Sequence, residues 1–368
     1  MKAGLAAASL VALVAAAPAS AHHALPAKFD SSKPLALGGI VTLVDWRNPH
    51  VHVFVNVRSA RGVVNWAVEL ESPIDLEQNG WTRDTVRPGD EVTVRGIAAR
   101  NGSPQVWADS LALAGTGHEV LNLRRPDPAP PLAARPAPRW PDGQPRLGPL
   151  PGGAVGYWAS TASPALVENG ANVRMDEWGL LANLADAPRV APLQPWALAL
   201  YQERQRASLD DDPLFLNCKP PGGPRQFQDR YGVQFVEDRA RRRVFVLIGG
   251  GNNNYRIVYL DGRSHVGQVN GDDDNPLYYG RSVGRWEGDT LVADTRGFNE
   301  DFWFASGGLP HTGDLRLVER FTRTDFDTLR YEVTVEDAGA YTRPWLGGWT
   351  LRWIGQEQPR HLCQENRP

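Results

Sequence analysis

Cysteine is almost missing from this sequence: its 368 residues include only two, Cys218 and Cys363, and both lie in the downstream half. Neither belongs to a recognisable cysteine–histidine nucleophile motif, which argues against a catalytic thiol. An excess of charge of one sign is also missing, because 39 basic residues face 42 acidic residues and the formal net charge is -3. Charge therefore gives no reason to expect nucleic acid or an anionic membrane surface as a partner.

Long apolar runs are missing after the N-terminus. The one at the start, residues 5–17, is too short to span a bilayer comfortably, and it precedes the small-x-small sequence Ala19-Ser20-Ala21. These features predict a signal peptide over residues 1–21. We expect a periplasmic or secreted protein without a membrane anchor, whose mature chain begins at His22. In such an oxidising compartment the two cysteines are expected to form a disulfide, with two buried free thiols as the alternative.

Stretches of helix-forming residues are few, whereas 37 glycines and 30 prolines supply many turns. That composition is typical of a β-rich chain, and the length is natural for two domains. Between residues 125 and 153 proline, arginine and glycine recur, which favours an extended, semi-rigid connector. We therefore predict a first domain at 22–120, a linker at 121–153 and a second domain at 154–368.

The first domain has the pattern of five strands with a short helix before the fourth strand. Ser72-Pro73 ahead of residues 74–79 signals that helix, because serine caps a helix start and proline fits its first turn. This order of elements is that of an oligonucleotide/oligosaccharide-binding (OB) barrel. No stripe of basic residues interleaved with aromatics accompanies it, so the fold does not imply a nucleic-acid partner. The five strands are expected at 37–44, 51–57, 63–69, 91–98 and 106–113.

The second domain is expected to be a larger, lipocalin-like antiparallel β-barrel with one appended helix. Residues 193–207 carry apolar residues at helical spacing, with Pro195 in the first turn, and predict the helix. Hairpin turns without helical crossovers join the predicted strands, so eight strands can close into an up-and-down barrel. Gly156-Tyr157-Trp158 at the head resembles the opening strand of lipocalin-like barrels. The eight strands are expected at 233–237, 243–248, 255–260, 282–286, 290–295, 315–323, 328–335 and 349–354.

Two parts of the chain each resemble a family of exported bacterial proteins of unknown function. The first likeness is carried by Ala21-His22-His23-Ala24, Trp46-Arg47-Asn48-Pro49-His50-Val51-His52 and Gly80-Trp81-Thr82-Arg83. The second is carried by runs that include Cys218-Lys219-Pro220-Pro221-Gly222-Gly223-Pro224-Arg225, Ser282-Val283-Gly284-Arg285-Trp286-Glu287-Gly288-Asp289-Thr290 and Ala340-Tyr341-Thr342-Arg343-Pro344-Trp345. The second family usually has His-Pro after Asp-Gly-Arg, where this chain has Ser264-His265. Neither likeness implies an activity.

Histidines gather at the predicted mature N-terminus and on a nearby strand: His22, His23, His50 and His52. Because His50 and His52 are two residues apart on a strand, their side chains should leave the same face of the sheet and reach one ion. A terminal histidine can add its α-amine and its ring nitrogen. Such a nitrogen-rich set suits copper(II), with zinc(II) as a weaker alternative. The competing interpretation is a frayed terminus and a solvated histidine pair.

A second candidate site surrounds His311. A carboxylate from Asp294 or Asp289 could orient this histidine as a general base. No serine or cysteine occupies a nucleophile motif, so such a site would favour hydration, elimination or isomerisation over acyl transfer. Aromatic residues could line an adjoining pocket, although all of these residues could equally be structural. The predicted ligand-binding residues are Tyr278, Tyr279, Trp286, Trp303, Phe304, Tyr341 and Trp345.

Three hypotheses for the function follow. The first is binding of a small apolar or aromatic ligand by the larger barrel, with a copper site on the first domain. The second is a cofactor-free lyase, hydratase or isomerase that acts through His311 and a neighbouring carboxylate. The third is a periplasmic accessory protein that handles a metal. The sequence leaves open the ligand, whether the protein is an enzyme, and its oligomeric state.

Overall fold

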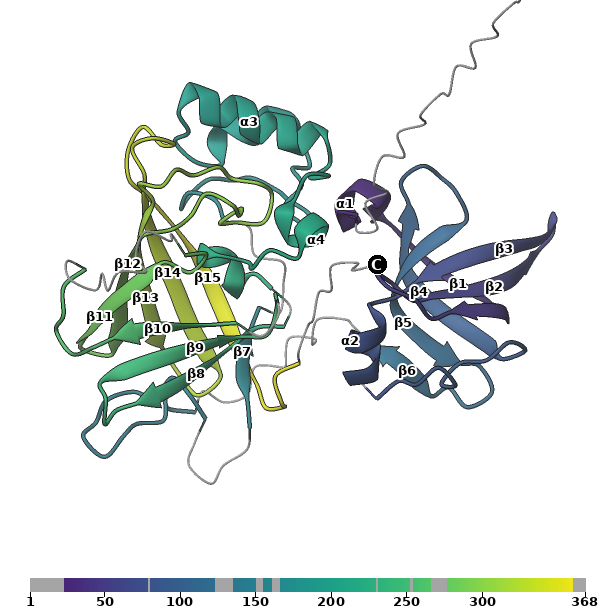
Figure 1. Cartoon of the computed structure of the whole chain (residues 1–368), viewed down its shortest axis with the longest axis horizontal. Coiled ribbons are helices and arrows are strands. Elements are labelled where there is room, and N and C mark those ends of the chain that lie inside the picture. Colours follow the sequence, from purple (N-terminus) through teal and green to yellow (C-terminus); the bar gives the residue numbers. More distant parts are fainter. Residues whose placement is uncertain are drawn as a thin grey trace, which may run out of the picture.

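The structure is a computed structural model that describes residues 23–78, 80–122, 135–149, 155–160, 166–229, 231–251, 254–265 and 277–359. It consists mainly of β-strands, arranged as a six-stranded sheet in the N-terminal part and a closed nine-stranded barrel in the C-terminal part (Figure 1). Each part has its own cluster of buried apolar side chains. The predicted fold class, mainly β with few helices, is confirmed. No helix of the described residues is long and apolar enough to cross a membrane.

The N-terminal sheet closes on itself in the strand order of an OB barrel. Its elements are α1 (Leu25–Lys28), β1 (Phe29–Asp45), β2 (His52–Ser59), β3 (Gly62–Glu69), α2 (Pro73–Gln78), β4 (Glu91–Ala99), β5 (Gln105–Leu113) and β6 (Glu119–Asn122). Neighbouring strands run β3-β2-β1-β4-β5-β6, and β3 also pairs in parallel with β5. The strands β1, β2, β3, β5 and β4 therefore form a ring, with α2 between β3 and β4 as the sequence predicts.

Local sequence signals account for these elements. Ser72 caps α2, because its hydroxyl accepts a hydrogen bond from the backbone N–H of Asp75 at 3.2 Å and donates one to that residue's carboxylate at 2.6 Å. Gly96 lies at a register shift between β4 and β5, where a Cβ atom would come within 1.9 Å of the Trp107 carbonyl oxygen. Only glycine allows so close an approach. β1 is longer than predicted, and the short β6 is an additional strand.

The C-terminal barrel contains nine strands in the order β10-β11-β12-β13-β14-β15-β7-β8-β9. They are β7 (Tyr157–Ala159), β8 (Val233–Asp238), β9 (Arg243–Ile248), β10 (Tyr255–Tyr259), β11 (Arg281–Glu287), β12 (Thr290–Arg296), β13 (Arg316–Arg323), β14 (Thr328–Glu336) and β15 (Trp345–Ile354). The prediction of an eight-stranded ring is wrong by one strand. The three-residue β7, at the predicted Gly-x-Trp head, lies between β15 and β8 and pairs with both.

An odd number of strands that alternate in direction cannot close into a ring without one parallel pair. In this barrel the parallel pair is β10 with β11, and its register contains two residue pairs, Val258 with Ser282 and Tyr259 with Val283. The other neighbouring strands pair antiparallel, as predicted. We call the β10–β11 pairing the parallel seam.

The barrel interior is filled with side chains. The 3-10 helix η2 (Gly223–Phe227) is buried along its whole length, and its Phe227 ring lies 5.3 Å from Phe321 and 4.6 Å from Tyr331. Phe235 packs against Phe321 from another strand. Among the described residues, aromatic side chains therefore occupy the part of the barrel interior around η2.

Helices cover the barrel from outside. Among them, α3 (Pro195–Arg206) confirms the predicted helix and lies across one end of the barrel (Figure 1). The others are the 3-10 helix η1 (Leu184–Arg189) and the short α4 (Pro213–Asn217). Asp212 caps α4 by accepting a hydrogen bond from the Leu214 backbone N–H at 3.0 Å.

Part of the predicted linker belongs to the barrel. Of the predicted linker, residues 123–134 and 150–153 lie outside the described residues, but 135–149 pack against the strands. The Trp140 ring is held by the guanidinium groups of Arg146 at 3.7 Å and Arg239 at 4.8 Å. Leu147 is fully buried, and its carbonyl accepts a hydrogen bond from the Trp158 indole at 2.8 Å. Residues 135–149 thus pack on the barrel through tryptophan and leucine, and the predicted bounds of the connector stay a prediction.

The sheet and the barrel are in contact. The Ser31 hydroxyl donates to the Asp176 carboxylate at 2.7 Å, and the Tyr231 hydroxyl to that of Glu71 at 3.3 Å. Trp178, from the chain around the barrel, packs against a small buried cluster on the sheet that contains Phe29, Ile97, Ala99 and Trp107. The N-terminal sheet therefore faces the barrel with the end that carries its histidines.

Candidate metal centre

Glu69 is the centre of a group of polar side chains at one end of the N-terminal sheet. It is the last residue of β3, and its partner across the β2–β3 hairpin is His52. The backbone pairing continues beyond the two strands, since Val51 N–H donates to the Glu71 carbonyl and Leu70 N–H donates to the Val51 carbonyl. These bonds hold His50, just before β2, beside Glu69.

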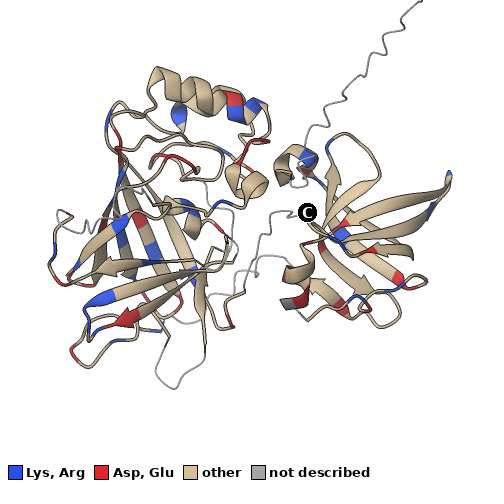
Figure 2. Ribbon diagram, in the orientation of Figure 1, with Lys and Arg blue, Asp and Glu red and all other residues tan. Residues whose placement is uncertain are grey.

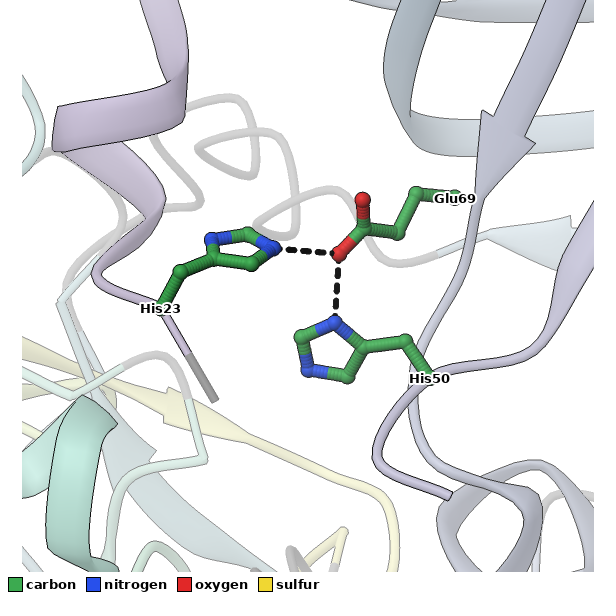
Figure 3. A group of neighbouring side chains, drawn as sticks. All are labelled: His23, His50 and Glu69. Atoms are coloured by element: carbon green, nitrogen blue, oxygen red, sulfur yellow. Dashed lines mark hydrogen bonds and ion pairs between the residues drawn. The ribbon is translucent and has the colours of Figure 1, made fainter. Parts of the chain in front are cut away.

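Two histidines meet one oxygen of the Glu69 carboxylate. His23, which comes directly before α1, donates from Nε2 to Oε1 at 2.7 Å, and His50 donates from Nδ1 to the same oxygen at 2.5 Å (Figure 3). The ligand atoms of all three residues lie within 4.8 Å of one another. The Glu69 side chain is 2% exposed, whereas those of His23 and His50 are 28% and 14% exposed. Three segments of the chain thus bring a set of metal-type ligands to one point near the surface.

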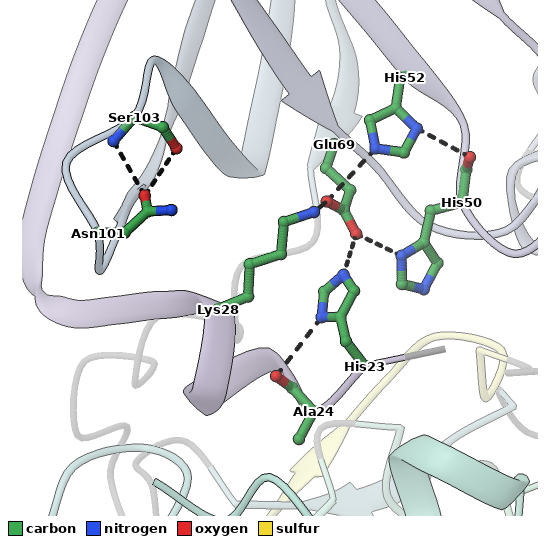
Figure 4. Close-up of polar contacts among 8 residues, drawn as sticks. All are labelled: His23, Ala24, Lys28, His50, His52, Glu69, Asn101 and Ser103. Carbon is green, nitrogen blue, oxygen red and sulfur yellow. Dashed lines mark hydrogen bonds and ion pairs between the residues drawn. The ribbon is translucent and has the colours of Figure 1, made fainter. Parts of the chain in front are cut away.

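The second carboxylate oxygen faces two other side chains. Lys28 Nζ lies 2.5 Å from Oε2, and His52 Nε2 lies 3.4 Å from it (Figure 4). The other ring nitrogen of His52, Nδ1, is 3.2 Å from the His50 carbonyl oxygen. The two oxygens therefore have separate partners, which leaves Oε1 as the oxygen shared by His23 and His50.

The environment keeps Glu69 ionised. Burial by itself raises the pKa of a carboxyl group, but hydrogen bonds from His23, His50 and His52 outweigh burial and hold the pKa of Glu69 well below its usual value. An ionised carboxylate beside two imidazoles is a donor set of borderline hardness, which suits zinc(II) and copper(II).

An apolar wall borders the group. The His50 ring lies edge-on to Trp107 at 5.4 Å, and the His23 ring lies 6.1 Å from Phe29. Phe29 and Trp107 belong to the buried cluster against which Trp178 packs. Apolar side chains on one side strengthen electrostatic interactions at Glu69, because they exclude water from it.

The sequence found part of this group. His23 and His50 are brought together as predicted, and His52 joins them through the other oxygen of Glu69, although His50 lies outside β2 and the two do not share a strand face. The fourth predicted ligand, His22, lies outside the described residues. Glu69 was missed. A two-residue turn at 60–61 sets the β2–β3 register, so counting back from that turn places Glu69 opposite His52.

The predicted histidine–carboxylate pair at His311 is not formed. The His311 ring is buried, and its two nitrogens lie 3.0 Å from the Phe302 carbonyl oxygen and 3.2 Å from that of Thr312. Burial lowers the pKa of His311, and the nearest charges that oppose this effect are those of Asp337 and Glu300. This imidazole packs against Phe302 at 4.6 Å as part of the core.

The two aspartates proposed to orient His311 have other partners. Asp294 is bound by Arg316 at 2.6 and 3.1 Å and lies 3.3 Å from His265. Arg316 also bridges to Glu336 on the next strand. Figure 2 shows basic and acidic residues mixed on the strands of the barrel. Asp289, at a hairpin turn, is bound by Arg139 at 2.6 Å. Both carboxylates therefore belong to surface ion pairs.

The predicted aromatic pocket residues separate into two groups. Tyr278 and Tyr279 line a cavity of about 990 Å³ beside the parallel seam. The other five form or pack against the barrel core: Trp286, Trp303, Phe304, Tyr341 and Trp345. These five side chains are thus packed among other apolar side chains of the described residues.

Cys218 is buried and is not a free cysteine. It terminates α4 in a left-handed conformation with φ of 51°. Cys363 lies outside the described residues, so the disulfide between the two stays a prediction.

The fold and the site define a mainly β protein with a candidate metal centre of two histidines and one carboxylate on its N-terminal sheet. Residues 10–107 match the model of a family described as a family of unknown function, DUF6152. This match is consistent with the first of the two resemblances, and it contains every residue of the Glu69 group. The second resemblance stays a prediction. No curated protein matches the chain.

Proposed function

We propose that this is an exported protein that binds a transition-metal ion through His23, His50 and Glu69. The observation that carries the proposal is the convergence of their three ligand atoms within 4.8 Å, from three separate segments of the chain. Three protein ligands leave coordination positions for water or for a ligand from another molecule. Such a site suits a protein that takes up and passes on a metal, which is the accessory role among the hypotheses above.

A carboxylate oxygen only accepts hydrogen bonds, so His23 Nε2 and His50 Nδ1 each carry the proton that they direct at Glu69 Oε1. To bind a metal ion at this point, each ring would present the lone pair of that nitrogen and carry its proton on the other ring nitrogen. Because an imidazole protonated on both nitrogens cannot ligate a metal, the affinity should fall as the pH falls. If export removes residues 1–21, the α-amine and ring of His22 become neighbours of His23 in sequence and favour copper(II) over zinc(II).

Metal titration of the purified, metal-free mature chain tests the proposal. We expect one copper(II) or zinc(II) ion per chain by calorimetry and native mass spectrometry. His50→Ala and Glu69→Gln should each weaken binding by at least about tenfold. His118→Ala is the matched control, because His118 is an exposed histidine on the same sheet. Variants that stay folded but bind as tightly as the wild type would contradict the proposal.

A second candidate function is the binding of a small molecule by the barrel. The cavity of about 990 Å³ beside the parallel seam supports it, because cavities of roughly 300–1,000 Å³ hold small organic ligands. Tyr278 and Tyr279, two of the predicted ligand-binding residues, line it. Native mass spectrometry of freshly purified protein should detect a co-purified organic molecule. Catalysis through His311 receives no support from the contacts of that residue.

A further inference from the structure

Lys28 brings a positive charge to the Glu69 group. It is the last residue of α1, and its Nζ donates to Glu69 Oε2 at 2.5 Å (Figure 4). The lysine side chain is 30% exposed, whereas that of Glu69 is 2% exposed. An ammonium group has three N–H donors, and within the described residues Nζ donates one hydrogen bond, the one to Glu69. Lys28 is therefore both a partner of the carboxylate and a donor at the solvent side of the group.

The charges of the group are balanced before a metal ion enters. In the described part of the chain no second carboxylate oxygen joins His23, His50 and Glu69, so the charge of Lys28 cancels the single negative charge. Imidazole rings are neutral when they ligate a metal, and so is the α-amine of His22. A divalent ion would therefore bring two positive charges for which these ligands provide no counter-charge.

The acidic residues two positions after Lys28 and after Glu69 have other partners. Asp30 lies 3.3 Å from Lys33 and 3.6 Å from Arg100. Glu71 accepts a hydrogen bond from the Tyr231 hydroxyl of the barrel at 3.3 Å. Neither carboxylate belongs to the set of ligand atoms that meet at Glu69. The missing negative charge is thus left to a ligand that enters with the metal.

The apolar wall makes this imbalance unfavourable. The Phe29 ring lies 5.3 Å from Lys28 Nζ, and the Trp107 ring lies 5.4 Å from that of His50. Water screens charges poorly beside such a wall, and a charge partly removed from water requires a partner. An anion in the coordination shell would provide this partner at the place where the charge is added.

We propose that the metal-loaded Glu69 group binds a small monovalent anion, such as a carboxylate, at an open coordination position beside Lys28. The donor atom of the anion ligates the ion, and a free N–H of Lys28 donates to the anion. Because Lys28 and the ion bind the two oxygens of one carboxylate, Nζ lies within about 7 Å of the ion, a gap that a small anion spans. This inference rests on the proposed metal binding and adds to it the class of ligand that the open position takes.

Charge distinguishes an anion from a neutral ligand. A neutral nitrogen or oxygen donor completes the coordination shell equally well but leaves both positive charges of the ion uncompensated. An anion offsets one of them and is attracted by Lys28 as well. The lysine should therefore strengthen the binding of anions and leave the binding of neutral donors almost unchanged.

Two probes test the inference: azide, an anion, and imidazole, a neutral donor. Each is titrated by calorimetry at one pH into the mature chain loaded with copper(II), or with zinc(II) if only that ion binds. Lys28→Gln removes the charge but keeps an N–H donor for Glu69 Oε2, so it should still bind one metal ion. It should weaken azide binding at least about fivefold and leave imidazole binding within about twofold of the wild type.

Lys33→Gln is the matched control. Lys33 is on β1 of the same sheet, is 52% exposed and is paired with Asp30, so its loss should change neither affinity. Lys28→Arg keeps the positive charge and should keep most of the azide affinity.

The outcomes separate the two proposals. Equal azide binding by the wild type and Lys28→Gln would keep metal binding and overturn the role of the lysine charge. Equal weakening of azide and imidazole would mean that Lys28 only holds Glu69 in place, and would also overturn the inference. Loss of azide binding in Lys28→Arg as large as in Lys28→Gln would contradict an effect of charge. A wild type that binds neither copper(II) nor zinc(II) would overturn both proposals.

Discussion

The N-terminal sheet and the C-terminal barrel each bury one glutamate that the pattern of residues along its strand does not predict. The two glutamates differ in the side chains that surround them. Glu69 on the N-terminal sheet is surrounded by three histidines and a lysine, whose side chains are 14–30% exposed. Glu319 in the barrel is surrounded by Arg256, Tyr331 and Thr295, all of them buried. Burial of the carboxylate is the same in both places, so burial alone does not identify a functional site.

The partners make the difference. Imidazoles near neutral pH exchange protons readily and are metal ligands, and at Glu69 they reach the solvent. The guanidinium at Glu319 stays charged at every physiological pH, and no solvent reaches it. The Glu69 group can therefore accept a different cation without unfolding, whereas the Glu319 pair is a permanent part of the core. The following predictions test this contrast.

The largest effect is expected from Glu319→Gln. This change leaves Arg256 as a buried, uncompensated charge, which should cost about 3–5 kcal/mol of unfolding free energy. Denaturant unfolding measures the loss. The double variant Arg256→Met with Glu319→Leu removes both charges and should recover much of it. A double variant as unstable as the single one would mean that shape, and not charge, dominates at this position.

Metal addition should stabilise the wild type through the Glu69 group. At a free copper(II) concentration about 100 times the dissociation constant, the unfolding free energy should rise by about 2.7 kcal/mol. A chelator should reverse the gain, which thermal unfolding detects. Glu319→Gln should keep the gain, whereas Glu69→Gln should lose it. If copper(II) changed the stability of Glu319→Gln and Glu69→Gln by the same amount, the proposed difference between the two carboxylates would be wrong.

The pH dependence of stability should reveal the effect of burial on His311. Burial lowers its pKa in the folded protein below the ordinary value of about 6.5. Between these two pKa values the unfolded chain binds more protons, so the contribution of neutral His311 is present above about pH 6.5 and is lost as the pH falls. The difference in unfolding free energy between wild type and His311→Gln should shrink from pH 7.5 to pH 5.

The smallest effect is expected from Asp289→Asn. The side chains of Asp289 and Arg139 are 53% and 44% exposed, and exposed pairs of this kind contribute little to stability because solvent screens them. Denaturant unfolding and ligand titration should therefore hardly distinguish the variant from the wild type. A strong effect on ligand binding would mean that Asp289 has a functional role. It would contradict our interpretation of the Asp289–Arg139 contact as a structural ion pair.

Much of the fold could be predicted from local signals. Alternation of buried and exposed residues placed the first-domain strands, and Ser72 placed α2, because both signals act within a few residues. The ninth barrel strand was indicated only by the resemblance of Gly156-Tyr157-Trp158 to an opening strand and was not counted in the ring, because the three residues of β7 are too few for alternation to show. Its existence depends on partners far along the chain, β15 and β8.

The candidate sites were harder to predict for the same reason. Histidines are conspicuous in a sequence, so His23 and His50 were found, but Glu69 is one of many acidic residues and stands out only once the hairpin register is known. The sequence around His311 does not indicate whether its ring contacts a carboxylate or a backbone carbonyl group. Arg256 and Glu319 lie 63 residues apart and meet only across the closed ring.

The parallel seam also has a consequence for how the barrel tolerates change. It is held by two residue pairs, whereas the antiparallel pair β14–β15 has eight. Separating β10 from β11 would break few interstrand hydrogen bonds. The strands that remain paired would form an entirely antiparallel sheet. New termini made by circular permutation, or an inserted sequence, between β10 and β11 should thus break few ladder bonds, and evolution has the same freedom to remodel the cavity mouth at that position. Of the neighbouring barrel strands, β7 and β8 share still fewer, with one residue pair.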